Sequence, residues 1–246
     1  MPLANRVDPW GRCHATERRG LFFGNRGVLH DGAGRIVRHR SSERRWIVCL
    51  TEFKGRRRRL LRPGHYTELF FLDEAVALAA GHRPCAECRR PAFGAYLDAL
   101  GDLSVRRAPQ LDGRLDAERG RHPDLDRPVA ALPDGAFVAD GGRALLVLDG
   151  RLIPWSPAGY EAAVELDPAI PYRLLTPPTS LRALTGGYKV TIHPEALSPP
   201  SVGGRCRPGS VSTAASSRRD RPVGHARCRG QDGRAGDRAS GWMVAG

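Results

Sequence analysis

The chain of 246 residues lacks any run of about eighteen apolar residues, the length that a membrane-spanning helix needs. Its first ten residues have neither a charged start nor an apolar stretch, so no secretory signal peptide is indicated. Catalytic signatures are also missing: the sequence has no HEXXH motif, nucleophile elbow, P-loop or paired-carboxylate motif. We therefore expect a cytoplasmic protein without membrane contacts. Metal-assisted hydrolysis is a weaker alternative, with these candidate residues: His65, Glu68, Asp73, Glu74 and His122.

Acidic residues are scarce relative to basic ones, and the formal net charge is +13. Residues 1–100 hold 19 Lys and Arg against 10 Asp and Glu, residues 101–197 hold 11 against 13, and residues 198–246 hold 9 against 3. A folded segment with a basic excess attracts polyanions because it releases their counterions. The charge therefore predicts a nucleic-acid partner, and the alternative is a solvated surface that only keeps the protein soluble.

Cysteines are few, and only Cys85 and Cys88 lie close together in the sequence. Disulfide frameworks belong to short secreted chains, whereas C-x2-C in an intracellular protein is typical of metal binding or redox chemistry. The pair stands just before an expected helix, whose N-terminal amides favour the negative charge of thiolates. This arrangement is typical of a zinc knuckle, so we expect zinc as the cofactor.

Short apolar runs separated by turn residues predict an α+β fold in the first hundred residues. Asp73 is a good N-cap and Gly81 suits the position after a helix end. Pro91 suits a first helical turn. The expected elements are a hairpin of 27–30 with 35–38, strands 45–50 and 66–72, and helices 74–80 and 91–100, the strands forming a small antiparallel meander.

The second half of the chain predicts a β-rich unit. Asp149-Gly150 is a hairpin dipeptide between two apolar runs. The expected elements are strands 136–139, 144–148, 151–155, 172–175 and 188–192 with a helix at 180–184. The complete prediction is a zinc-stabilised domain 1–104, a linker or weak helix 105–133, a small β-rich domain 134–196 and a disordered basic tail 197–246. The composition of this tail also fits translation from a shifted frame, in which case Cys206, His225 and Cys228 carry no chemistry.

Residues 69–90, LFFLDEAVALAAGHRPCAECRR, resemble the second half of the Ada-type N-terminal zinc-binding domain of DNA alkylation repair. The resemblance implies zinc held by two cysteine pairs, of which Cys85 and Cys88 match the second. Cys49 occupies a similar place to the upstream C-x3-C pair. Its partner position holds Phe53, and the alternative H-x3-C form fails because Arg45 stands where the His would be.

A structural zinc site needs four ligands, so one more is expected beside Cys49, Cys85 and Cys88. We place His30 first, because the expected meander brings it to the same end of the sheet as Cys49. Cys13, His65 and His82 are the alternatives. Cys49 is otherwise a buried strand cysteine, and His82 is otherwise a packing residue.

Nucleic-acid binding is the first functional hypothesis, and the Ada resemblance implies DNA as the partner before RNA. The residues expected at phosphates are Lys54, Arg56, Arg57, Arg58, Arg59, Arg83, Arg89 and Arg90. The Ada resemblance implies a second hypothesis, a repair enzyme in which the zinc thiolate of Cys49 accepts a methyl group from a DNA methylphosphotriester. A non-catalytic protein-interaction module in 134–196 is a further alternative.

Overall fold

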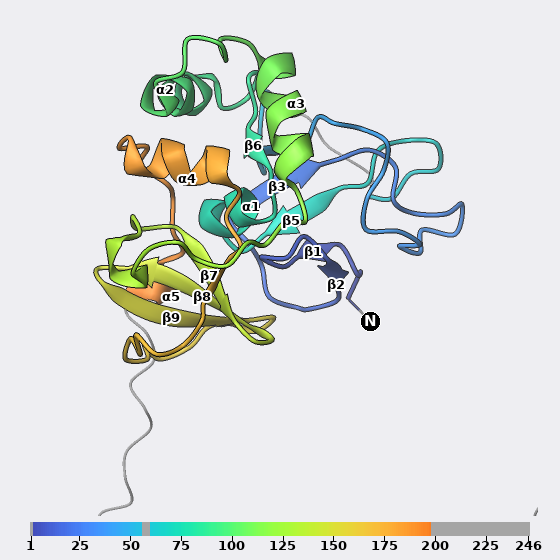
Figure 1. The fold of residues 1–246 in the computed structure, drawn as a ribbon. Helices are drawn as coiled ribbons and strands as arrows, with labels where there is room; N and C mark the ends of the chain where they lie inside the picture. The colour runs from blue at the N-terminus through green and yellow to red at the C-terminus, as the bar shows by residue number, and fades with distance from the viewer. Residues whose placement is uncertain (1, 56–59, 198–246) are drawn as a thin grey trace, which may run out of the picture. The chain divides into compact units, whose positions relative to one another are not determined.

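The computed structural model describes residues 2–55 and 60–197. Within them the fold is mixed α+β, with two β-sheets and five α-helices (Figure 1). The arginine run 56–59 and the expected tail from residue 198 onward lie outside the described residues. No helix in the described part of the chain is both long and apolar enough to cross a membrane.

The first sheet has the strand order β2-β1-β5-β3-β4-β6. Strand β3 is antiparallel to β4 and β5, whereas β4 pairs in parallel with β6 at the sheet edge. The strands are β1 (Arg6–Val7), β2 (Cys13–His14), β3 (Phe22–Asn25), β4 (Ile47–Leu50), β5 (Leu69–Phe71) and β6 (Arg83–Pro84).

The two faces of this sheet differ because successive side chains along a strand point to opposite faces. Phe22, Val48 and Phe71 belong to the main hydrophobic core on one face. Phe23 and Cys49 are register partners on β3 and β4 and lie together in a separate small cluster. The alternation therefore places Cys49 outside the main core.

Helix α1 (Glu74–Ala79) is buried along its whole length in the interior. The Asp73 carboxylate accepts a hydrogen bond from the amide of Val76 at 2.9 Å, which confirms the predicted N-cap. Gly81 follows the helix with a φ of 82°, as expected for a residue that must turn the chain after a helix end. This turn leads directly into β6 and then to the C-x2-C pair.

The second sheet has the order β10-β9-β8-β7-β11, and all its pairs are antiparallel. Asp149 and Gly150 both have positive φ, as a type I′ hairpin turn requires. The strands are β7 (Phe137–Asp140), β8 (Arg143–Leu148), β9 (Arg151–Ser156), β10 (Gly159–Tyr160) and β11 (Arg173–Leu174). Four of the five strands predicted in this region are thus confirmed. The fifth, 188–192, is not a strand.

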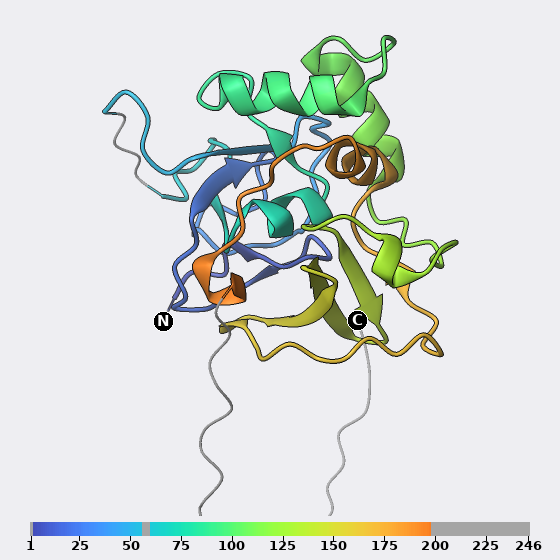
Figure 2. The ribbon, with the colours of Figure 1, turned by 90° about the vertical axis from the view of Figure 1, so that its left-hand side faces the viewer.

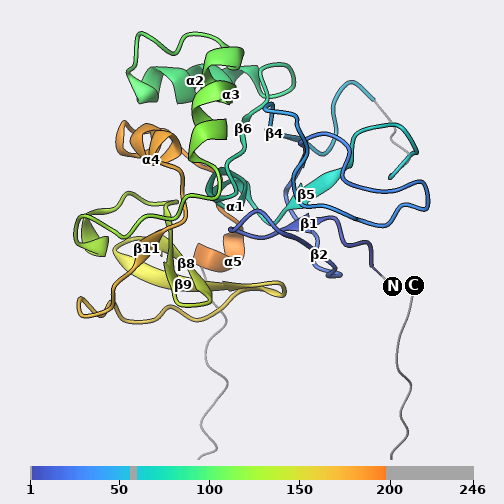
Figure 3. The same cartoon turned by 45° about the vertical axis from the view of Figure 1, so that its right-hand side comes forward.

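Helices α2 and α3 lie close to α4 on one side of the molecule, as Figures 1 and 3 show. Figure 2 shows the second sheet below α4. The remaining helices are α2 (Arg90–Leu100), α3 (Ala108–Glu118), α4 (Pro178–Thr185) and α5 (Pro194–Leu197), with a short 3-10 turn η1 at Val129–Ala131. The segment 105–133, expected as a linker or weak helix, holds the regular helix α3. Leu111 and Leu115 stabilise this helix, because both are completely buried in the core.

The segments expected as separate domains share their hydrophobic cores. Phe71 and Ala75 from the first part lie in one cluster with Phe137 and Ile153 from the second. A second cluster joins residues of α2 and α3 to the second sheet. All described residues belong to one compact unit.

The expected meander differs from the observed pairing. Segments 27–30 and 35–38 do turn back antiparallel, joined by the bridge of His30 to Ile36 and by the amide of Val37 donating to the carbonyl of Leu29, but neither is a strand of the sheet. The strand beside β4 is β3, which contributes Phe22 and Phe23 and buries more apolar surface than the Gly- and Arg-rich segment can. Cys49 therefore lies opposite Phe23 and not opposite Gly34.

Candidate metal centre

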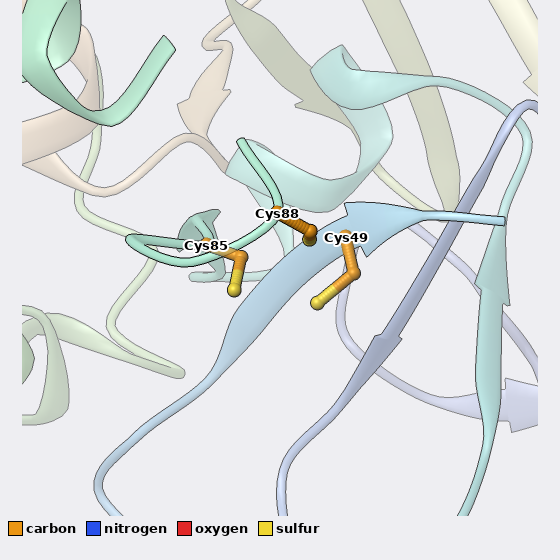
Figure 4. A group of neighbouring side chains, drawn as sticks. All are labelled: Cys49, Cys85 and Cys88. Carbon is orange, nitrogen blue, oxygen red and sulfur yellow. The ribbon is translucent and has the colours of Figure 1, made fainter. Parts of the chain in front are cut away.

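Three cysteine sulfurs converge at the edge of the first sheet. Cys49 lies on β4, Cys85 directly follows β6, and Cys88 precedes α2. Their Sγ atoms all lie within 4.8 Å of one another, and Figure 4 shows the three side chains pointing toward a common centre. The parallel pairing of β4 with β6 fixes this arrangement, because the Cys85 amide donates to the carbonyl of Val48 at 2.9 Å.

The spacing of the sulfurs fits a tetrahedral metal ion. Zinc–sulfur bonds of about 2.3 Å place the sulfurs of a tetrahedral site about 3.8 Å apart. The observed upper limit of 4.8 Å requires only a small closing movement of the side chains. Thiolates are soft ligands that select zinc, copper(I) or iron–sulfur clusters over magnesium or calcium. The group is therefore able to hold a metal ion.

The local electrostatics divide the three thiols into one donor and two acceptors. The hydrogen bond from the Cys49 thiol, together with the backbone amides of Cys88 and Glu87, lowers the pKa of Cys85 to about 5. The same thiol, with the amide of Leu50, lowers the pKa of Cys88. Donation to both sulfurs, together with burial, raises the pKa of Cys49. The thiolate form of Cys85 is thus favoured before any metal binds.

The cluster is partly shielded from solvent. Cys49 and Cys85 are 6% and 7% exposed, whereas Cys88 is of intermediate exposure. Phe23 is buried against the sulfurs, and Phe70 packs against the same cluster. A metal here would therefore be approached from the side of Cys88.

The expected fourth ligand, His30, does not join the three sulfurs. Its Nδ1 lies 2.7 Å from the hydroxyl of Thr67 and its Nε2 lies 3.3 Å from the carbonyl of Arg62. His30 was predicted as a ligand because the expected meander would have brought it near Cys49. It lies instead in the loop between β3 and β4, where both ring nitrogens have partners. The group of close ligand atoms found in the described residues contains the three cysteines alone.

The alternative ligands are also placed elsewhere. Cys13 lies on β2, where its sulfur accepts a hydrogen bond from Arg26 at 3.4 Å. His65 is exposed, and its ring contacts the carbonyl of Pro63. His82 is completely buried between the rings of Trp46 and Phe71, so the packing alternative describes it.

Two arginines expected at phosphates are buried in ion pairs, which corrects that expectation. Arg83 forms a two-pronged pair with Asp112, with distances of 2.9 and 2.8 Å. Arg89 pairs with the buried carboxylate of Glu74 at 2.7 Å. Their charges are neutralised inside the fold, so neither side chain faces a phosphate. Sequence spacing did not reveal these partners because Asp112 is distant in sequence and Glu74 belongs to another helix.

Lys54 and Arg90 remain exposed, as phosphate contacts require. Arg56, Arg57, Arg58 and Arg59 lie outside the described residues.

The carboxylates considered for hydrolysis have structural partners. Asp73 caps α1 and also accepts from the hydroxyl of Tyr160 at 2.8 Å, and burial raises its pKa. Glu68 accepts from the amide of Leu61 at 2.8 Å. Glu74 accepts from the hydroxyl of Tyr188 at 2.6 Å. These carboxylates hold segments together at separate points of the fold.

Sequence reasoning missed the aromatic residues beside the thiols. The ring of Phe23 lies 6.3 Å from that of Tyr66 and 5.9 Å from that of Phe70. The guanidinium of Arg6 lies 4.6 Å from the Phe70 ring centre. The alternation of side chains along a strand could have predicted this position. Phe70 stands between the core residues Leu69 and Phe71, so its side chain must point to the opposite face of the sheet.

Comparisons with protein-family models, with curated proteins and with solved structures found no match.

Proposed function

We propose that this chain is a zinc-binding protein that contacts nucleic acid, DNA in the first place, with the sheet face that carries the thiols. One juxtaposition is the main support: the three cysteine sulfurs lie on the same face as Phe23 and Phe70. Zinc fits the donor set, because it is a usual metal of tetrahedral thiolate sites. The resemblance of residues 69–90 to the Ada-type domain agrees with this choice of metal.

The role of zinc in this proposal is to fix the edge of the sheet. It would tie β4 to the turn between β6 and α2 through Cys49, Cys85 and Cys88. Structural zinc binding contributes folding free energy because its ligands are not preassembled in the unfolded chain. The three thiolates leave a fourth position, which a water molecule or a ligand from outside the described residues would fill.

The nucleic-acid part of the proposal is supported by aromatic and basic side chains around the thiols. Tyr66 is 38% exposed, and Phe70 is partly exposed with Arg6 stacked on its ring. Aromatic platforms bind the bases of single strands, while Lys and Arg side chains contact the phosphates. Lys54 and Arg90 supply such charges. The arginine run 56–59 is included in this proposal from its sequence alone.

Methyl transfer to Cys49 receives less support. Cys49 is 6% exposed, so a phosphotriester would have to pass the surrounding side chains to reach its sulfur. Cys88 is the more accessible thiol. Mass spectrometry of the Cys49 peptide, after incubation with methylphosphotriester DNA, distinguishes the two functions: a methyl group on Cys49 would establish repair in place of simple binding.

A matched set of variants tests the binding proposal. Tyr66→Ala should weaken binding of labelled single-stranded DNA about 5- to 150-fold, since stacking contributes ~1–3 kcal/mol per base. Lys54→Ser should flatten the dependence of log affinity on log salt by about 0.7. Lys189→Ser is the control, because Lys189 is also exposed but lies in the second half of the chain. Fluorescence anisotropy that finds all three variants equal to the wild type would remove the support for a nucleic-acid face.

A further inference from the structure

A second potential site is a pocket of about 160 Å³ where distant segments of the chain meet. The turn between β1 and β2, the loop before β4, and the ends of α1 and α3 contribute to its wall. Arg12, Arg40 and Arg119 line it together with His39 and His122, and no Asp or Glu is among its lining residues. None of the three clustered cysteines lines it either. The wall therefore has a strong excess of positive charge.

A fourth arginine lies beneath this wall. Arg26 is completely buried, and its Nη2 donates to the carbonyl of Gly11 at 2.7 Å. Its Nε and Nη1 have no hydrogen-bond partner among the described residues, and Arg26 has no ion pair there. An added Cβ on the pocket residue Gly11 would be in ordinary contact with Nη1, at 3.7 Å. The wall of the pocket at Gly11 therefore lies directly over this buried cation.

Arg119 is buried in a similar way but belongs to the lining itself. Its Nε donates to the carbonyl of Gly81, and its Nη1 donates to the carbonyl of Arg44. Its Nη2 has no hydrogen-bond partner in the described part of the chain. The guanidinium carbons of Arg26 and Arg119 each lie 4.4 Å from the ring centre of Trp46. The guanidinium of Arg40 lies 5.6 Å from the same ring centre, so one indole faces three cations.

Two nearby carboxylates, Asp8 and Asp116, are fewer than these cations, and Asp8 attracts Arg12 and Arg26 without forming an ion pair in the described part of the chain. Asp116 is 2.6 Å from Arg40, 3.6 Å from Arg44 and 3.3 Å from Arg119, so one carboxylate serves three guanidiniums. Burying guanidiniums without a counter-charge is unfavourable, and burial lowers the pKa of both Arg26 and Arg119. An anion in the pocket would relieve this imbalance.

We propose that this pocket binds a phosphate group, as inorganic phosphate or as the phosphate monoester of a nucleotide. Guanidinium groups match the oxygens of phosphate with paired hydrogen bonds, and three arginines line this pocket. The volume is below the roughly 300–1,000 Å³ of sites that enclose whole cofactors, so it suits a phosphate group whose remainder extends outward. This site is independent of the thiols and goes beyond the proposed function.

The rim arginines allow a test that spares the buried ones. Arg26 and Arg119 also hold backbone carbonyls, so replacing them would disturb folding. Arg12 and Arg40 are exposed. The control is Arg35→Gln, because Arg35 pairs with Asp31 at 2.8 Å much as Arg40 pairs with Asp116, but lies outside the pocket.

The experiment is calorimetric titration of the full chain at constant ionic strength, with inorganic phosphate, adenosine 5′-monophosphate and adenosine as probes. We expect both phosphates to bind and adenosine not to bind. The double variant Arg12→Ser/Arg40→Ser should weaken phosphate binding at least about 10-fold, as the loss of a charge-assisted hydrogen bond implies. Arg35→Gln should bind like the wild type.

The source of the phosphate is distinguished by two oligonucleotides that differ only in a 5′-phosphate or a 5′-hydroxyl. Preference for the 5′-phosphate that disappears in the double variant would assign the pocket to a nucleic-acid end. Binding of the small phosphates without such a preference would assign it to free nucleotides. The proposal is overturned if no phosphate-bearing probe binds, or if the double variant binds as tightly as Arg35→Gln.

Discussion

The buried ion pair between Arg83 and Asp112 offers a sharp test of the internal architecture. The pair joins β6 to α3. Strand β6 leads to the thiol pair, and α3 lies in the segment 105–133 that was predicted to be a linker or weak helix. The two side chains are 3% and 9% exposed, and both hydrogen bonds are shorter than 3 Å. Arg83 also donates to the carbonyl of Pro84 at 3.1 Å, so its donors are well satisfied.

Asp112→Leu should strongly destabilise the chain, because it leaves the Arg83 charge buried and unpaired. Breaking such a pair costs about 3–5 kcal/mol. For a chain of this size each kcal/mol shifts Tm by about 2–4 °C, so the expected loss is about 6–20 °C. The double variant Arg83→Met/Asp112→Leu should recover most of this loss, since no charge is then left buried.

Thermal and urea denaturation of the wild type, the single variant and the double variant measure the effect. A single-variant loss below about 1 kcal/mol is the behaviour of an exposed pair and would show that no buried charge is left unpaired. Equal losses in the single and double variants would show that packing, and not an unpaired charge, determines the result. The salt dependence of nucleic-acid binding should be unchanged in the double variant, since Arg83 does not face a phosphate in this fold.

Three further outcomes are expected. Burial, reinforced by Arg26 and Arg119, lowers the pKa of His82 well below its ordinary value. The unfolded state therefore binds one more proton than the folded state at acid pH, and stability falls as the pH drops below about 6.5. His82→Phe should reduce this loss of stability by about 1.4 kcal/mol between pH 7.5 and 5.5, as measured by urea titrations. Gly24→Ala should destabilise the fold by about 1–3 kcal/mol, because the new Cβ would clash with the Ile47 carbonyl and lie 2.7 Å from the Phe71 ring. Gly94→Ala should stabilise the fold by about 0.5–1 kcal/mol, because nothing lies within 4 Å of the new Cβ. Equal melting curves for the two variants would contradict this contrast. Chelation of the metal should speed amide hydrogen exchange in β4, β6 and the start of α2 but not in α1, and uniform acceleration would show that the metal holds the whole fold.

Local signals in the sequence predicted the elements that depend on neighbouring residues. The Asp73 cap, the Gly81 turn and the Asp149-Gly150 hairpin are all confirmed, because each rests on backbone preferences within a few residues. The approach of Cys49 to the C-x2-C pair was also predicted, through the Ada resemblance. These features need no knowledge of distant partners.

The remaining features depend on contacts between distant residues. Strand β4 pairs with β3 across a long loop, so sequence order suggested the wrong neighbour. Arg83 and Arg89 belong to a basic stretch whose carboxylate partners lie elsewhere in the chain. The pocket beside Trp46 is assembled from separate segments, and no local pattern marks it.

Zinc binding by the three cysteines is measured by counting metal ions in intact protein purified without chelator, using native mass spectrometry with elemental analysis. We expect one zinc per chain in the wild type and in Cys13→Ser, because Cys13 lies outside the group of close sulfurs. Cys49→Ser and Cys88→Ser should each lose the zinc or hold it much more weakly. A wild type without stoichiometric metal, or a zinc content that survives in both Cys49→Ser and Cys88→Ser, would contradict the account.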